Sequence, residues 1–158
     1  MNQNELETVV KAVVQQLQAA KGMKLETAKA LIEEVEKEAK RIGVRAVIAV
    51  SDASGRPIAV HCMDGSYIGS YDIAVNKTYT SIAFQMPTKE LAKLAAPGGS
   101  LYGIQHTNEG KIVIFGGGEV LFKNGQMVGA VGISGGTAQQ DTKLGEFAKN
   151  IFENNQIR

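Results

Sequence analysis

The sequence contains very little cysteine. Its 158 residues include one, Cys62, so no internal disulfide can form and the paired cysteines of a structural zinc site are missing. The stability of the fold therefore has to come from packing.

Long apolar runs and an excess of charge of one sign are also absent. The formal net charge of +1 provides no long-range field that would attract nucleic acid or anionic lipid. No apolar run reaches the roughly eighteen residues of a membrane span, and the N-terminus lacks the pattern of a secretory signal. We therefore expect a cytoplasmic protein whose partners are neither nucleic acid nor a membrane.

What is present is the composition of a globular domain. Hydrophobic residues make up 44% of the chain and charged residues 21%. A chain of 158 residues can build one domain with a substantial core, but it is short for two. We therefore look for a single core and its attachments.

The first segment predicts an amphipathic helix over Asn4–Leu17. Its apolar residues recur at helical spacing and form one stripe: Leu6, Val9, Val10, Val13, Val14 and Leu17. Gly22 interrupts the pattern. We predict that residues 1–20 are a helix with a linker, attached to a domain over residues 24–158.

The rest of the chain predicts an α+β domain. Asn124-Gly125 is a strong hairpin signal, and Thr137 with Gln140 forms a capping box that begins the last helix, which continues to about Asn154. The other predicted helices cover Leu25–Ile42, Ser70–Phe84 and Thr88–Ala95, and the predicted strands cover Val44–Ser51, Pro57–Met63, Lys111–Phe115, Glu119–Lys123 and Met127–Ser134. The order α-α-β-β-α-α-β-β-β-α favours a mostly antiparallel sheet of about five strands with helices packed on it.

Glycines gather in the C-terminal half, at Gly116, Gly117 and Gly118 above all. Neither of the glycine-rich nucleotide-binding spacings occurs. The triple glycine is either a backbone device, where a turn or a close approach needs a residue without a side chain, or a surface against which a flat ligand lies.

Two further positions suggest an anion site. Ser134 leads through two glycines into the N-terminus of the last helix, where free N–H groups favour an anion, although the capping box already uses two of them. Lys77 lies on the inner side of its predicted helix, where its amine needs a carboxylate, a carbonyl or a ligand anion unless it reaches solvent.

Candidate ligands for a metal or haem iron are few. The chain has two histidines: His61 in an apolar strand and His106 in a loop next to an aromatic residue. Haem iron accepts imidazole, thiolate or tyrosinate, so His106, His61, Cys62 and Tyr102 are eligible. A structural role is the alternative for each histidine. No pattern of catalytic nucleophiles, zinc ligands or paired carboxylates occurs, so we assign no catalytic residue and favour a binding protein over an enzyme.

Several short motifs of the domain are distinctive. They are Asn76-Lys77-Thr78-Tyr79-Thr80, Met86-Pro87-Thr88, Ser100-Leu101-Tyr102-Gly103, Ile114-Phe115-Gly116-Gly117-Gly118 and the run from Val128 to Gly136 that continues to Gln140-Asp141. These motifs resemble the GlcG/HbpS-like family, and most of all the C-terminal haem-binding domain of the propanediol-utilisation cobalamin adenosyltransferase. The resemblance covers about Leu25 to Phe152.

The resemblance implies a layered α+β fold, homo-oligomerisation and, in several members, haem bound at or near a subunit interface. It does not bring the adenosyltransferase activity, which belongs to a different domain. The helix predicted over Leu25–Ile42 contains no histidine, so any axial ligand that a relative supplies from this helix has no counterpart here.

The first helix resembles the short targeting helices that carry enzymes into bacterial microcompartments. This resemblance implies a shell or cargo protein as partner of the apolar stripe; packing on its own domain or on a sister subunit is the alternative.

Three hypotheses follow from the sequence. The first is a haem or tetrapyrrole binder of a microcompartment, with haem between the His106 loop and the glycine-rich strands. The second is a non-catalytic oligomeric assembly module. The third is an enzyme acting on a small organic acid or aldehyde, with Lys77, Ser134 and the helix terminus as its anion site.

Overall fold

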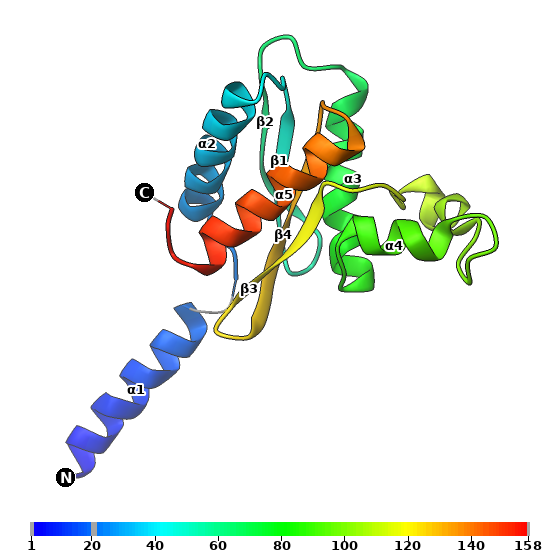
Figure 1. Cartoon of the computed structure of the whole chain (residues 1–158). Helices are drawn as coiled ribbons and strands as arrows, with labels where there is room; N and C mark the ends of the chain where they lie inside the picture. Colours follow the sequence, from blue (N-terminus) through cyan, green and yellow to red (C-terminus); the bar gives the residue numbers. More distant parts are fainter. Residues whose placement is uncertain (1, 20–21, 158) are drawn as a thin grey trace.

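An antiparallel sheet forms the centre of the computed structural model, which describes residues 2–19 and 22–157 (Figure 1). Within these residues the sheet has four strands, in the order β2-β1-β4-β3. The strands are β1 (Val47–Asp52), β2 (Pro57–Cys62), β3 (Gly118–Lys123) and β4 (Gln126–Ser134), and all neighbours are antiparallel. β2 and β3 are therefore the two edges.

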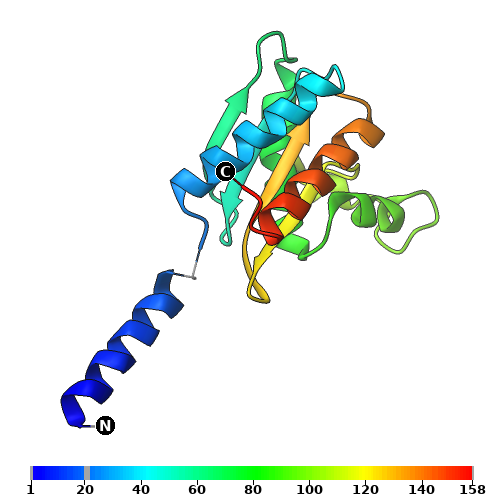
Figure 2. The ribbon, with the colours of Figure 1, turned by 60° about the vertical axis from the view of Figure 1, so that its left-hand side comes forward.

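Helices cover both faces of the sheet. Figure 2 shows α2 (Leu25–Arg41) and α5 (Ala138–Glu153) side by side over one face. α3 (Gly69–Phe84) packs on the other face. α4 (Thr88–Ala95) and the short 3-10 turns η1 (Ile104–His106) and η2 (Asn108–Gly110) follow it; residues 88–110 are called the α4 lobe below. The predicted α+β class is confirmed.

The core lies on both sides of β1, which explains why this strand is apolar throughout. Ile48 and Val50 point into the large cluster beneath α2 and α5, while Val47 and Ala49 point toward α3. All four side chains are buried. A strand covered on both faces has no polar side, and for this reason the sequence shows no alternation here.

Gly132 of β4 allows α3 to lie close to the sheet. A Cβ at this position would lie 2.1 Å from the carbonyl oxygen of Ala74 and 3.0 Å from Cβ of Lys77. No larger residue fits without moving the helix. Gly132 therefore sets how closely α3 approaches the sheet.

The predicted strand Lys111–Phe115 is wrong, and the sheet has four strands rather than about five. The segment is extended and its Ile112 and Val113 are buried, as expected from the sequence. Its backbone, however, bonds to a side chain of α3: Val113 N–H donates to Oγ1 of Thr80 at 3.0 Å, and this hydroxyl lies 3.3 Å from the carbonyl of Lys111. The threonine takes the place of a neighbouring strand.

α1 (Gln3–Ala19) extends away from the rest of the protein (Figures 1 and 2). Asn2 and Glu5 close its first turn, because the backbone N–H of each donates to the side chain of the other at 2.8 and 2.9 Å. The apolar stripe is exposed over its described side chains, Leu6, Val9, Val10, Val13 and Val14. The side chain of Leu17 lies outside the described residues. None of the described helices is long and apolar enough to cross a bilayer.

Candidate functional site

Lys77 is the most deeply buried charged residue of the described chain, with 0% of its side chain exposed. Its Nζ donates to the carbonyl oxygen of Ile133 at 2.5 Å and to Oδ2 of Asp141 at 3.1 Å. Burial lowers the pKa of Lys77, and the charge of Asp141 acts in the opposite direction. The amine therefore ties α3 to the end of β4 and to the first turn of α5.

The triple glycine lies next to this amine, with Gly117 directly against it. Gly117 has a φ of +114°, and a Cβ there would lie 2.6 Å from the oxygen of Ile133 and 2.7 Å from Nζ of Lys77. Gly118 N–H donates to Oγ1 of Thr88 at 2.9 Å, and Gly116 faces Thr142 of α5. The structure thus brings the predicted residues Lys77, Gly116, Gly117 and Gly118 together and favours the interpretation of the glycines as a backbone device.

The exposed surface next to this cluster is aromatic. The ring of Phe115 lies with its centroid 4.8 Å from Nζ of Lys77, and 40% of the residue is exposed. Gly116, Gly117 and Gly118 are buried. A flat ligand on this side would contact Phe115 rather than the glycines.

Donors at the start of α5 are largely occupied within the protein. Ser134 Oγ donates to Oγ of Ser70 at 3.1 Å. The predicted capping box of Thr137 and Gln140 is confirmed, and Gly136 N–H donates to Oδ1 of Asp141 at 2.9 Å. This helix terminus therefore offers few free N–H groups to an anion.

The two histidines lie on opposite sides of the sheet. His61 belongs to the edge strand β2, and its Nδ1 lies 2.7 Å from Oε1 of Glu36 in α2. Cys62, the next residue, is exposed. His106 is exposed at the end of η1 in the α4 lobe, four residues after Tyr102, which is 68% exposed. The proposed metal ligands His61 and His106 therefore do not meet within a single chain.

Glu119 of β3 has a buried side chain, and this residue was not singled out from the sequence. Only 3% of the residue is exposed, and Gly145 of α5 leaves room for its side chain. Burial raises the pKa of Glu119 to about 7, although the charges of Lys89 and Lys149 oppose this shift. The signal that would have identified it is a glutamate that stands directly after the triple glycine and before the apolar run Val120–Phe122.

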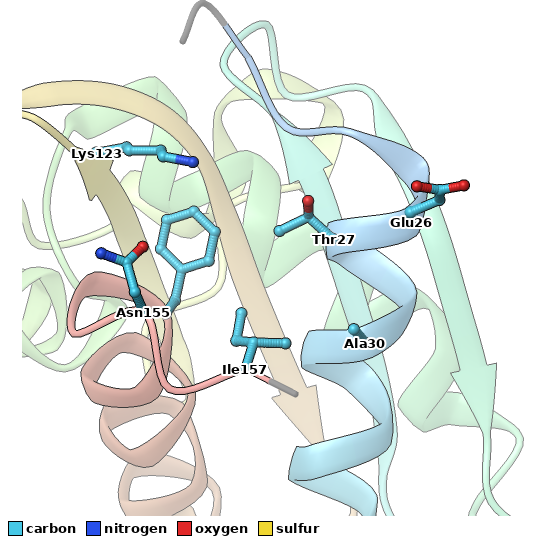
Figure 3. A pocket seen from close by; sticks show the side chains of 7 residues that line it. Glu26, Thr27, Ala30, Lys123, Asn155 and Ile157 are labelled. Atoms are coloured by element: carbon cyan, nitrogen blue, oxygen red, sulfur yellow. The ribbon is translucent and has the colours of Figure 1, made fainter. Parts of the chain in front are cut away.

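Two open pockets lie on the side of α2. One, of about 320 Å³, separates the first turns of α2 from Lys123 and the C-terminal tail, where Ile157 faces Thr27 and Ala30 (Figure 3). The other, of about 370 Å³, lies beside Cys62 and includes Glu36 and Lys40. Neither includes His106 or Tyr102, so a ligand of these residues would lie on an exposed surface.

Comparison with known proteins identifies the family of this domain. The family described as "Haem degrading protein HbpS-like" matches residues 23–148. The chain belongs to the HbpS-like family. This match begins after α1, so the first helix lies outside the shared region.

Three relatives illustrate what the chain is similar to. A 15.0 kDa protein encoded in the dhaT-dhaS intergenic region of Citrobacter freundii is 43% identical over 128 residues, which cover 81% of this chain and 90% of the relative. The corrinoid adenosyltransferase PduO of the same organism is 36% identical over 110 residues, which are 70% of this chain but only 33% of PduO. The chain thus spans about a third of PduO. The crystal structure of the PduOC:haem complex has 30% sequence identity and a TM-score of 0.78, covering 82% of this chain and 94% of that one.

Proposed function

We propose that this protein binds haem or a related tetrapyrrole. The observation that carries the proposal is the likeness to the PduOC:haem complex over nearly the whole domain, within a family named for haem degradation. Exposed aromatic side chains, which suit a flat apolar ligand, support it: Phe115 next to Lys77, and Tyr102 in the α4 lobe, where His106 is exposed as well. Haem bound there would supply an iron that accepts a neutral imidazole, and His106 is the residue we expect to hold it.

His61 is the second candidate ligand. Glu36 fixes the imidazole through Nδ1, which leaves Nε2 to bind a metal, as in the carboxylate–histidine pairs that orient metal ligands. The exposed thiol of Cys62 adjoins it. Because this group lies on the opposite side of the sheet from His106, single substitutions distinguish the two sites.

Titration of the purified full chain with haemin, followed at the Soret band, tests the proposal. We expect haemin to bind with a shifted Soret band. The variant His106→Ala should bind haemin with an affinity at least tenfold lower. Glu109→Ala, in the same exposed lobe, is the matched control and should bind like the wild type. A spectrum without a shift, or one that survives the double variant His106→Ala/His61→Ala unchanged, would contradict the proposed ligands.

We also propose that α1 attaches the protein to a shell or cargo protein of a bacterial microcompartment. The helix closes its own N-terminus, and its apolar stripe is exposed. The helix layer of its own domain offers little to cover it, because the outer sides of α2 and α5 consist of exposed charged and polar residues such as Lys37 and Glu146. With Glu5, Glu7 and Lys11 as its charges, α1 also lacks the basic face that anionic lipid requires.

Fusion of residues 1–20 to a fluorescent protein, expressed beside microcompartment shells, tests this attachment. We expect the fusion to gather in the shells. Val10→Glu, which places a charge in the stripe, should leave it diffuse, whereas Thr8→Glu on the polar side should not. A wild-type fusion that stays diffuse would refute the attachment.

A non-catalytic, homo-oligomeric assembly module is the alternative function. It is favoured by three large exposed side chains: Tyr67 and Ile68 between β2 and α3, which are 74% and 96% exposed, and Tyr71 in the first turn of α3, which is 49% exposed. An oligomer that gives no haem spectrum would favour this alternative. The enzyme hypothesis needed the amine of Lys77 to bind the substrate anion, but this amine is already paired with Asp141.

A further inference from the structure

The two edges of the sheet are protected very differently. At β3, side chains occupy the outward backbone groups: Thr88 accepts from Gly118 N–H, Lys149 donates to the carbonyl of Val120 at 2.9 Å, and Glu153 accepts from Phe122 N–H at 3.2 Å. An edge whose groups are occupied in this way cannot pair with another strand. β3 is therefore a closed edge.

β2 has an open segment, Val60–Cys62. Met63 N–H donates to the carbonyl of Ala46, and in the antiparallel register His61 opposes Ile48. The backbone groups of Val60 and Cys62 consequently point away from β1, and among the described residues none of them has a hydrogen-bond partner. Among residues 2–19 and 22–157, no strand pairs with the outer side of β2. Pro57 and the bulge that follows it close the earlier part of this edge.

We propose that a second copy of this chain occupies this edge, with the two β2 strands antiparallel about a twofold axis through His61. Val60 and Cys62 lie symmetrically on either side of His61. The axis therefore pairs the N–H and C=O groups of Val60 with those of Cys62 in the partner. The side chains of Val60 and Cys62, which then adjoin across the axis, are both compatible with an apolar contact. The two four-stranded sheets become one continuous sheet.

The charges of α2 support this arrangement. α2 packs across β1 and β2, and His61 contacts Glu36, so the axis through His61 also passes close to Glu36. With strands about 4.8 Å apart, the two copies of α2 would be about 10 Å apart, the usual distance between packed helices.

Glu33 and Lys40 lie three residues before and four residues after Glu36, on the same side of α2, and both are exposed. Because the two α2 helices are antiparallel about the axis, Glu33 of each copy faces Lys40 of the other. The two Glu36 carboxylates also meet near the axis, where each is bonded to His61 of its own chain. The exposed charges on either side of them, Glu33 and Lys40, are complementary between the two copies, as a twofold interface requires.

Charge exchange on α2 tests the dimer without touching its core. The mass of the full chain is measured by sedimentation at low ionic strength. We expect the wild type to be a dimer. Lys40→Glu and Glu33→Lys should each lower the affinity of dimerisation at least tenfold, and the double exchange should restore it. Lys143→Glu, on the exposed side of α5, is the matched control and should leave association unchanged. A monomeric wild type, or single variants that associate normally, would overturn the proposal.

A disulfide tests the register. In a Cys62→Ser background, His61→Cys places two cysteines opposite each other at the axis, whereas Ala59→Cys places them about 14 Å apart, too far for a disulfide. Oxidation should give a covalent dimer with the first variant and not with the second. Equal cross-linking of both, or none at position 61, would refute the register.

This inference rests on the homo-oligomer that was given above as the alternative function, and it names a specific interface for that oligomer. Its failure and that of haem binding are distinguishable, because sedimentation measures the first and the Soret band the second.

Discussion

Glu119 is the residue whose acid–base chemistry the fold alters most clearly. Its side chain is buried, with Cγ against Gly145 of α5. The ion pairs Lys89–Glu146 and Lys149–Glu153 lie around it, so each nearby lysine already has another carboxylate partner. Ionisation of Glu119 in the folded protein is therefore poorly compensated.

Glu119→Gln should remove a pH dependence of stability. The pKa of Glu119 is raised from 4.5 to about 7, so the folded protein holds this proton more tightly than the unfolded chain. The resulting stability is complete below pH 4.5 and is lost as the pH rises through 7, a change of about 3 kcal/mol. Urea unfolding at pH 4.5 and pH 8 should show this loss in the wild type and a much smaller one in the variant. The exposed substitution Glu26→Gln serves as the control, and a variant with the wild-type pH dependence would refute the role of Glu119.

At the scale of single residues, the sequence indicated whether a side chain is buried better than it indicated which residue that side chain contacts. It placed Lys77 on the inner side of its helix and required a carboxylate, a carbonyl or a ligand anion there. Asp141, 64 positions later, is that carboxylate. Neither local spacing nor composition indicates which distant carboxylate meets a buried amine, because the pairing depends on how α3 and α5 approach the sheet.

At the scale of elements, local chemistry predicted most of the boundaries. α4 and the capping box of α5 agree with the prediction, since caps and helical periodicity depend on neighbouring residues only. Lys111–Phe115 was wrong because a buried extended segment has the same apolar pattern whether a strand or the Thr80 hydroxyl satisfies its backbone. Predicting this segment correctly required knowing the tertiary structure.

Removal of α1 should leave the stability of the domain nearly unchanged. The helix is capped by its own residues, its described apolar side chains are exposed, and it packs extensively on no other element. We expect the chain without residues 1–20 to melt within about 2 °C of the full chain, because little apolar surface is lost from the core. Differential scanning calorimetry of both proteins measures this. A decrease of 5 °C or more would show that α1 packs on its own domain and would argue against a role in binding another protein.

At the scale of the whole molecule, the sheet separates two sets of functional candidates. The open edge β2 carries His61, Cys62 and the contact to Glu36, whereas the α4 lobe carries His106 and Tyr102 on the other side. The sequence could not predict this separation. Its two histidines looked equivalent as ligands, and only the strand order places one of them at an edge that is free to pair.

The separation predicts that haem binding and dimerisation are independent. Lys40→Glu should dissociate the β2 dimer yet keep the wild-type Soret shift and haem affinity within about twofold, because Lys40 lies beside β2 and far from the lobe that holds His106. His106→Ala should do the reverse: it should lose haem affinity and keep the dimer mass. Haem titration and sedimentation on the same preparations measure both properties. If Lys40→Glu instead abolished the Soret shift, the iron ligand would lie at the β2 interface, and His61, held by Glu36 in each copy, would replace His106 as the residue that binds haem.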